Sequence, residues 1–171
     1  MNKAFITQSW DHYRQVVGIG LRAVAALPEA SLDTHPVAGM RTPKQLAVHL
    51  FAGTHEFPKA VVAGKIGDYD EDAIAAGLKT KAELLAWCRR QWEAGAAIVP
   101  TLTDAQIAGI VETPWGINFP GFVLLKITED EFWHHRGQLY VYLRALGVEP
   151  PMLYDFEGNE PAFQPKAVAQ A

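Results

Sequence analysis

The stretch PGFVLLKITEDEFWHHRGQLYVYLRAL, residues 120–146, carries the longest helical pattern in the chain. Its apolar and aromatic residues recur at steps of three and four, which places them on one face of an α-helix. Gly147 supplies a C-cap signal, and the pair Pro150-Pro151 prevents continuation of the helix. The pattern predicts a helix from about Pro120 to Leu146, roughly 40 Å long. Its buried face would hold Phe122, Leu125, Thr128, Phe132, His135, Leu139, Tyr142 and Leu146.

Two further helices are predicted by their start signals. Thr42-Pro43-Lys44-Gln45 combines an N-cap hydroxyl, a proline at the first helical position and the glutamine of a capping box. Gly64 is the matching stop signal, and Pro58 predicts a bend or an early end. Thr80-Lys81-Ala82-Glu83 is a second capping box, and Pro100 closes the helix that follows it.

The remaining segments complete the predicted architecture. Apolar residues keep the helical step from about Ser9 to Leu27, where Pro28 ends the pattern. A third capping box at residues 103–106 predicts a short helix or turn, and residues 110–119 look irregular or weakly extended. The acidic loop 64–78 predicts at most one short turn of helix. Four amphipathic helices with few strand signals predict an all-α fold, a four-helix bundle with long connectors.

Length, composition and charge exclude several classes of protein. The chain has 171 residues and a formal net charge of −4, and 49% of its residues are hydrophobic. We expect one domain over residues 1–151 and a mostly coiled tail over residues 152–171, disordered from about residue 164. The acidic balance and the lack of a Lys/Arg cluster predict that the chain binds no nucleic acid. No run of about 18 apolar residues and no apolar leader occur, so we expect a cytoplasmic protein that crosses no membrane.

Two of the six histidines, His49 and His135, lie on the apolar faces of predicted helices. Glu131 and His135 are one helical turn apart, so their side chains lie one above the other and can bind one cation. If the two faces meet, His49 supplies a third ligand and leaves positions open for water or substrate. Two imidazoles and one carboxylate suit Zn, Ni, Fe or Mn. Glu56, two turns after His49, is a candidate acceptor for a ligating imidazole or a general base.

Each of these residues also has a simpler interpretation. A lone buried histidine is more often a hydrogen-bonded core residue than a ligand, and Glu56 is equally well explained as a solvated glutamate. Asp130 and His134 form a competing pair at the same spacing, off the apolar face. Cys88, the single cysteine, is predicted to be a buried, unreactive thiol. Gly137 weakens a strong helix and suggests the close approach of another helix.

Two motifs resemble a known family. The segment EFWHHRGQLYVYLRALGVEPP, residues 131–151, resembles the C-terminal signature of the DinB/YfiT-like superfamily, where a His-x-x-x-His pair precedes Arg-Gly-Gln, Leu-Arg-x-x-Gly and proline. The stretch TPKQLAVHL, residues 42–50, with Glu56 beyond it, is similar to the family's helix-two motif, and Trp115-Gly116 also fits. The resemblance covers roughly residues 1–151. It implies a four-helix bundle, commonly dimeric, with a divalent metal held by three histidines.

The resemblance assigns the ligands residue by residue. His49 matches the first family histidine and His135 the third, whereas Glu131 stands where the family has the second. A carboxylate still binds metals, but this departure changes metal preference and affinity, or marks a member that has lost the metal. Members whose chemistry is understood resemble transferases or isomerases that use low-molecular-weight thiols.

Two functional hypotheses follow, and the sequence does not decide between them. The first is a homodimeric, metal-dependent enzyme, a thiol-dependent S-transferase or a hydrolase, that acts on a small electrophile. The second is a non-catalytic stress-response or ligand-binding bundle with a degenerate, metal-free site, in which Glu131 and His135 form a buried pair. The sequence also leaves open whether a dimer forms through the face bearing Trp133 or Trp92. The acidic loop 64–77 is a candidate cover for the pocket.

Overall fold

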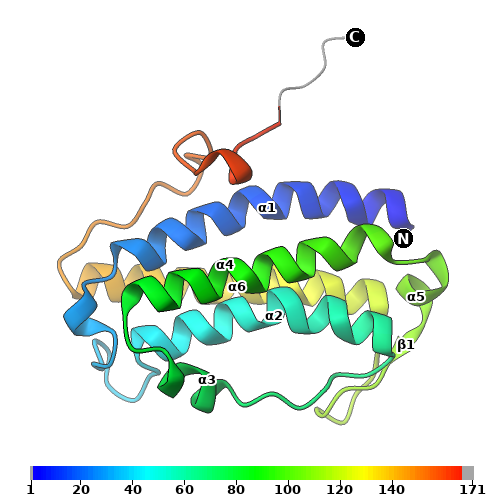
Figure 1. The fold of residues 1–171 in the computed structure, drawn as a ribbon, viewed down its shortest axis with the longest axis horizontal. Helices are drawn as coiled ribbons and strands as arrows, with labels where there is room; N and C mark the ends of the chain where they lie inside the picture. Colours follow the sequence, from blue (N-terminus) through cyan, green and yellow to red (C-terminus); the bar gives the residue numbers. More distant parts are fainter. Residues whose placement is uncertain (1, 167–171) are drawn as a thin grey trace.

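The computed structural model describes residues 2–166 and confirms the four-helix bundle. The short helices α3 (Glu71–Gly77) and α5 (Asp104–Ala108) lie in connectors, and strands β1 (Ile110–Val111) and β2 (Phe119–Pro120) pair antiparallel. None of the helices within the described range is long and apolar enough to cross a membrane. The four long helices are α1 (Lys3–Ala26), α2 (Pro43–Ala63), α4 (Lys81–Ile98) and α6 (Gly121–Ala145) (Figure 1).

The bundle is not a simple up-and-down arrangement. Helices α1 and α2 lie diagonally opposite, since each packs mainly against both α4 and α6. Helices α2 and α4 run in the same direction, and α1 and α6 run against them (Figure 1). A parallel pair of successive helices needs a connector that returns along the bundle, and residues 64–80 provide it. This return path places α3 against α2.

Helix α2 begins and ends at the predicted residues. The hydroxyl of Thr42 accepts from the Gln45 backbone N–H at 3.2 Å, and the Gln45 side chain accepts from the Thr42 N–H at 3.0 Å. Gly64 adopts the left-handed conformation, with φ of 75°, and its N–H bonds the carbonyl of Ala60. Such a C-cap strongly favours glycine because it lacks a Cβ. The local sequence therefore fixes both ends of this helix.

Pro58 lies inside α2 without ending it, and α4 packs closely against the helix at this point. Proline cannot donate to the carbonyl four residues earlier, which here belongs to Thr54. That carbonyl faces Gly95 of α4, where a Cβ would overlap the oxygen. The glycine lets the two helices approach until the Thr54 carbonyl lies against the Gly95 backbone. The Thr54 carbonyl, which has no helical N–H partner because residue 58 is proline, therefore lies against α4.

Helix α1 begins earlier than the expected Ser9. Asn2 caps it by accepting from the Phe5 N–H at 3.1 Å, and buried Ile6 extends the apolar face. Trp92 of α4, one of the two tryptophans considered for a dimer interface, lies in the core. Its ring stacks on that of Trp10, with centroids 5.7 Å apart.

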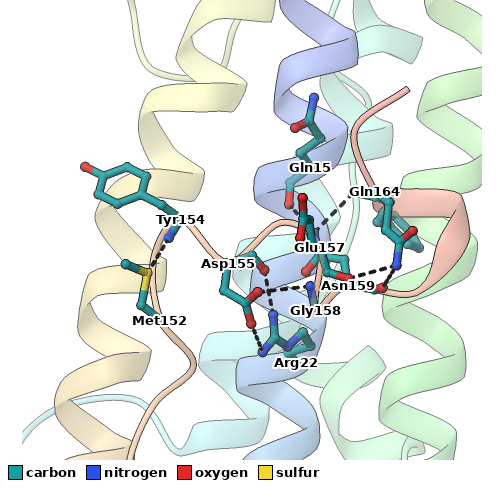
Figure 2. Close-up of polar contacts among 10 residues, drawn as sticks. Gln15, Arg22, Met152, Tyr154, Asp155, Glu157, Gly158, Asn159 and Gln164 are labelled. Atoms are coloured by element: carbon teal, nitrogen blue, oxygen red, sulfur yellow. Dashed lines mark hydrogen bonds and ion pairs between the residues drawn. The ribbon is translucent and has the colours of Figure 1, made fainter. Parts of the chain in front are cut away.

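Residues 152–166, which we name the C-terminal strap, lie against α1. Figure 2 shows Asn159, which is 4% exposed, donating to the backbone carbonyl of Gln15 at 2.9 Å. Arg22 of α1 bonds the Asp155 carboxylate at 2.8 Å (Figure 2). Of the expected disordered stretch, residues 164–166 are described and contact α1, where the Gln164 carbonyl accepts from Arg14 and Lys166 pairs with Asp11. Residues 167–171 lie outside the described residues.

Candidate metal centre

Helices α2 and α6 bring His49, Glu131 and His135 together. The Nε2 atoms of the two histidines lie 3.1 Å apart, and their rings meet edge to face with centroids 4.5 Å apart. The Glu131 carboxylate lies 3.0 Å from His135 Nε2. One potential ligand atom from each residue lies within 4.8 Å of the other two. We call these three side chains the donor trio.

His49 is oriented from behind by Glu71, the first residue of α3. Its Nδ1 lies 2.8 and 2.9 Å from the two carboxylate oxygens. Burial alone would raise the pKa of Glu71, but the hydrogen bond and charge of His49, the charge of Arg41 and a hydrogen bond from Tyr69 together outweigh it, and the pKa lies below its ordinary value. An ionised carboxylate can only accept, so Nδ1 carries the proton and donates it. In the neutral ring, Nε2 then presents its lone pair to the trio.

His135 is oriented in the same way by Gln138. Its Nδ1 lies 2.9 Å from Gln138 Oε1, while the amide nitrogen of Gln138 lies 3.1 Å from Nε2 of His134. With the amide in this orientation, Nδ1 of His135 donates and Nε2 carries the lone pair. Burial lowers the pKa of His135, which keeps the ring neutral at pH 7. When both rings are neutral, their Nε2 lone pairs point toward each other.

A divalent cation fits this arrangement. Two lone pairs and a carboxylate oxygen in contact repel one another unless a positive charge lies among them. Ligand nitrogens bound to zinc at about 2.0–2.1 Å in a near-tetrahedral site lie roughly 3.3–3.4 Å apart, close to the 3.1 Å observed here. The Glu131 side chain is 53% exposed, so one side of the trio is open to solvent. The donor set is that of an open site rather than a closed structural one.

A recess adjoins the trio along the two helices. Tyr69, from the connector before α3, forms part of its wall, and burial raises the pKa of this phenol to about 12. The tyrosine is therefore neutral at pH 7, and its hydroxyl hydrogen-bonds the Glu71 carboxylate. The connector thus contributes Tyr69 to one wall of the recess, and closure of the acidic loop over the pocket stays a prediction. The other lining residues outside the trio are Leu50, Gly53, Phe57 and Thr128.

The structure does not bring Glu56 into this group. Its carboxylate binds Lys59 at 3.0 Å and lies 3.5 Å from His55 Nδ1, and it does not line the recess. The competing carboxylate, Asp130, pairs instead with Lys126 at 3.0 Å. Cys88 is fully buried, and burial raises the pKa of its thiol, as expected for an unreactive cysteine.

Comparison with known proteins agrees with this architecture. A sequence profile of the DinB family matches residues 1–167. The chain belongs to the DinB family.

Relatives of this DinB-family chain come from Bacillus subtilis. The uncharacterized protein YjoA is 23% identical over 114 residues, which is 66% of this chain and 71% of YjoA. The crystal structure of YjoA, described as DinB-like, superposes with a TM-score of 0.66 at 21% identity, over 86% of this chain and 96% of that one. YfiT, described as a probable metal-dependent hydrolase with an unusual four-helix bundle topology, gives a TM-score of 0.63 at 22% identity, over 84% and 89%. At these identities the two structures show the shared fold.

Sequence reasoning missed Glu71 and Tyr69 in this DinB-family site. Both lie in the connector that returns the chain along the bundle, with Tyr69 20 residues and Glu71 22 residues after His49. The only sequence signal was the N-cap at Asp70, whose side chain accepts from Ala73 N–H. An acidic residue directly after such a cap begins a helix and points to no particular partner, so the pairing emerges only in three dimensions.

Proposed function

We propose that this DinB-family chain is a metal-dependent enzyme acting on a small electrophile, either as an S-transferase with a low-molecular-weight thiol or as a hydrolase. His49, Glu131 and His135 would hold a divalent Zn, Ni, Fe or Mn ion. The observation that carries the proposal is the pair of Nε2 atoms 3.1 Å apart, each with its Nδ1 bonded to an acceptor. The description of the similar YfiT as a probable metal-dependent hydrolase supports it.

The surrounding residues supply binding, orientation and charge. A bound divalent cation would act as a Lewis acid that lowers the pKa of a thiol or water toward neutrality. The connector and the walls of the recess exclude water from one side of the trio, while Glu131 leaves the other side open. The neutral Tyr69 phenol hydrogen-bonds Glu71, and it could donate to negative charge that develops on the substrate only by giving up that bond.

We keep Glu56 as the proposed general base, and this role requires its carboxylate to change orientation. Its carboxylate must turn away from Lys59 and His55 to reach a proton in the pocket. We expect Glu56→Gln to lower kcat about 10²–10⁴-fold without changing the metal content. Lys59→Ala, which frees the carboxylate, should not lower kcat. Unchanged kcat in Glu56→Gln would assign the residue to the surface ion pair alone.

Metal content tests the main proposal. Purified wild-type protein, His135→Ala and His55→Ala are measured by inductively coupled plasma mass spectrometry after incubation with Zn, Ni and Mn. His55 lies on the same helix as His49 but outside the trio, so it is a matched control. We expect near-stoichiometric metal in wild type and His55→Ala, and its loss in His135→Ala. Loaded protein is then screened with thiols and activated esters to separate transfer from hydrolysis.

One contact supports the alternative of a metal-free, non-catalytic bundle. The 3.0 Å separation of His135 Nε2 and Glu131 is also that of a direct hydrogen bond. In that bond His135 Nε2 carries the proton, so Nδ1 must accept one. The Gln138 amide must then be flipped so that its NH₂ group donates to His135 Nδ1. Absence of metal from every protein, together with destabilisation by Glu131→Gln, would favour a ligand-binding or stress-response role.

A homodimer is the proposed assembly. With Trp92 in the core, the half-buried Trp133 is the one of the two tryptophans that can reach an interface. Light scattering of wild type and Trp133→Ala tests this assembly, and a monomeric wild type would contradict it.

A further inference from the structure

The outer face of α6 turns toward solvent along the length of the helix. Buried residues such as Thr128, His135 and Leu139 face the bundle, and exposed residues recur at steps of three and four on the opposite side. We name these exposed residues the outer stripe: Lys126, Asp130, His134, Gly137, Val141 and Arg144. Among residues 2–166, no other segment lies within 4 Å of a Cβ placed on Gly137. The middle of the stripe therefore has no packing partner in the described part of the chain.

The outer stripe is evenly spaced about Gly137. Asp130 lies seven residues before this glycine and Arg144 lies seven residues after it. Seven residues are close to two turns of helix, so both side chains leave the helix in nearly the same direction as the glycine. The half-buried Trp133 and the exposed Val141 stand four residues before and after it. A two-fold axis at Gly137 would bring the acidic residue of one copy opposite the basic residue of the other.

Charge is distributed unequally along α6. Residues 121–135 carry one lysine and three acidic side chains, a formal charge of −2, whereas residues 136–145 carry two arginines and no acid, a formal charge of +2. Two such helices attract each other when antiparallel and repel each other when parallel. Lys126 is bonded to Glu129 at 3.1 Å and to Asp130 at 3.0 Å, so its single charge leaves the acidic half negative. Arg144 forms no ion pair with any of residues 2–166, and its guanidinium is available to another molecule.

Exposed apolar residues adjoin the outer stripe. A stable interface buries about 800 Å² per partner, which is more than a narrow helix face supplies alone. The first residues of the strap widen the surface, since Met152, Leu153 and Tyr154 are 62%, 38% and 67% exposed. Met152 and Tyr154 lie beside α6 (Figure 2), and Tyr154 is near enough to Arg136 for their charges to interact. Large apolar side chains that are exposed together mark interaction surfaces.

We propose that the outer stripe binds the same stripe of a second copy, with the two α6 helices antiparallel and crossing at Gly137. The inference rests on the homodimer proposed above and gives that dimer its interface. Asp130 of each copy then faces Arg144 of the other, and the ring of Trp133 lies beside Val141 of the other copy. A glycine at the crossing point lets the helices approach to about 8 Å, the lower end of the range for packed helices. The interface is isologous, because each stripe contacts its own equivalent.

The donor trio stays outside this interface. Successive residues of a helix are about 100° apart, so His135 lies roughly 200° around α6 from Gly137 and faces the bundle. The two trios of the dimer are therefore separate. Substitutions in the stripe that separate the copies should leave the metal content of each chain unchanged, so the interface and the metal site are tested independently.

Reversed charges test the pairing and its direction. Sedimentation equilibrium is measured for wild type, Asp130→Arg and Arg144→Asp, and for an equimolar mixture of the two variants. We expect each variant alone to dimerise at least about tenfold more weakly than wild type, because both of its ion pairs become like-charge contacts. The mixture should recover the wild-type affinity, since both pairs of the mixed dimer are attractive again. Glu93→Arg, on the diagonally opposite α4, is the matched control and should dimerise as wild type does.

A bulky side chain at Gly137 tests where the helices cross. Gly137→Trp extends into the space that the partner helix would fill and should be monomeric, with the circular dichroism of the folded wild type. Gly137→Ala adds one carbon and should remain dimeric.

The outcomes separate the interface from the other proposals. A dimer that keeps its wild-type affinity in Gly137→Trp and in both charge variants would overturn this interface and leave the homodimer in place. Weakened variants that do not recover on mixing would overturn the antiparallel pairing. A monomeric wild type would refute the interface and the homodimer together, whereas the metal content of Gly137→Trp reports on the proposed function alone.

Discussion

At the scale of single residues, the contact that most distinguishes this site is the one between Glu71 and His49. The ionised carboxylate fixes the proton on Nδ1 and so turns the Nε2 lone pair toward the trio. Partners of this kind typically contribute 10–100-fold to metal affinity or activity. We expect Glu71→Ala to lower the affinity for Zn²⁺ about 10–100-fold, measured by competition with a chromophoric chelator.

Asp72→Asn is the control for this substitution. Asp72 is the next residue of α3 and bonds Gln45 at 3.2 Å rather than a histidine. The Asp72→Asn variant should therefore bind Zn²⁺ with wild-type affinity. Equal affinities in Glu71→Ala and wild type would mean that Glu71 only attaches α3 to α2.

Sequence alone located the donor trio but not its supporting residues. Glu131 and His135 could be paired because they lie one helical turn apart, and the family resemblance brought His49 to the same site. Glu71 could not, because its approach to His49 depends on the path of a long connector. The base assigned to Glu56 remains a prediction, since spacing along a helix does not show that Lys59 and His55 hold its carboxylate.

At the scale of elements, two helical glycines should respond oppositely to alanine. At Gly95, the new Cβ would overlap the Thr54 carbonyl and force α2 and α4 apart. We expect Gly95→Ala to destabilise the protein by about 1–3 kcal/mol or more, as overpacking does. At Gly137, which faces open space, alanine should stabilise it by up to about 1 kcal/mol. Urea unfolding measures both, and equal effects would refute the close helix contact.

The elements themselves were largely predictable from local signals. Capping boxes are short-range, and those opening α2, α4 and α5 all formed. The expectation that Gly137 marks a close helix approach was wrong within the chain, because no other segment of residues 2–166 lies within 4 Å of a Cβ at this position. A glycine in a helix shows that no side chain is present there. The sequence does not show whether a neighbouring segment, a ligand or solvent occupies the space that the side chain would have filled. The brief pairing of β1 with β2 also depends on contacts that local patterns do not encode.

At the scale of the whole molecule, helix order was not predictable from periodicity. A buried face says that a helix packs, but not against which neighbour. The parallel arrangement of α2 and α4 follows from the length of the connector between them, and that connector also supplies Tyr69 and Glu71 (Figure 1). Topology and site are therefore linked, since a short connector between these helices could not carry α3 back along the bundle.

Ion pairs attach the strap to the bundle, and we expect them to make its docking sensitive to acid. Lys166 lowers the pKa of Asp11, Arg22 lowers that of Asp155, and Arg89 lowers that of Glu160. A carboxylate with a lowered folded pKa stabilises the docked state above its unfolded pKa, about 3.9 for Asp and 4.3 for Glu. That contribution is lost as pH falls through the lowered folded value. The strap should therefore stay docked at pH 5 to 8 and loosen below about pH 4.

The side-chain amide of Asn159 reports strap docking directly, because it donates to the carbonyls of Gln15 and Phe163. We expect its NMR resonances to move toward solvent-exposed values below about pH 4, and at higher pH in Asp155→Asn. Glu157→Gln is the control: it removes a strap charge whose carboxylate pairs with no Lys or Arg among residues 2–166. If Asn159 loosened only together with the Trp10–Trp92 core, the strap would be part of the bundle's cooperative unit. Earlier release would instead show that the ion pairs, rather than Phe163 in the core, hold the strap in place.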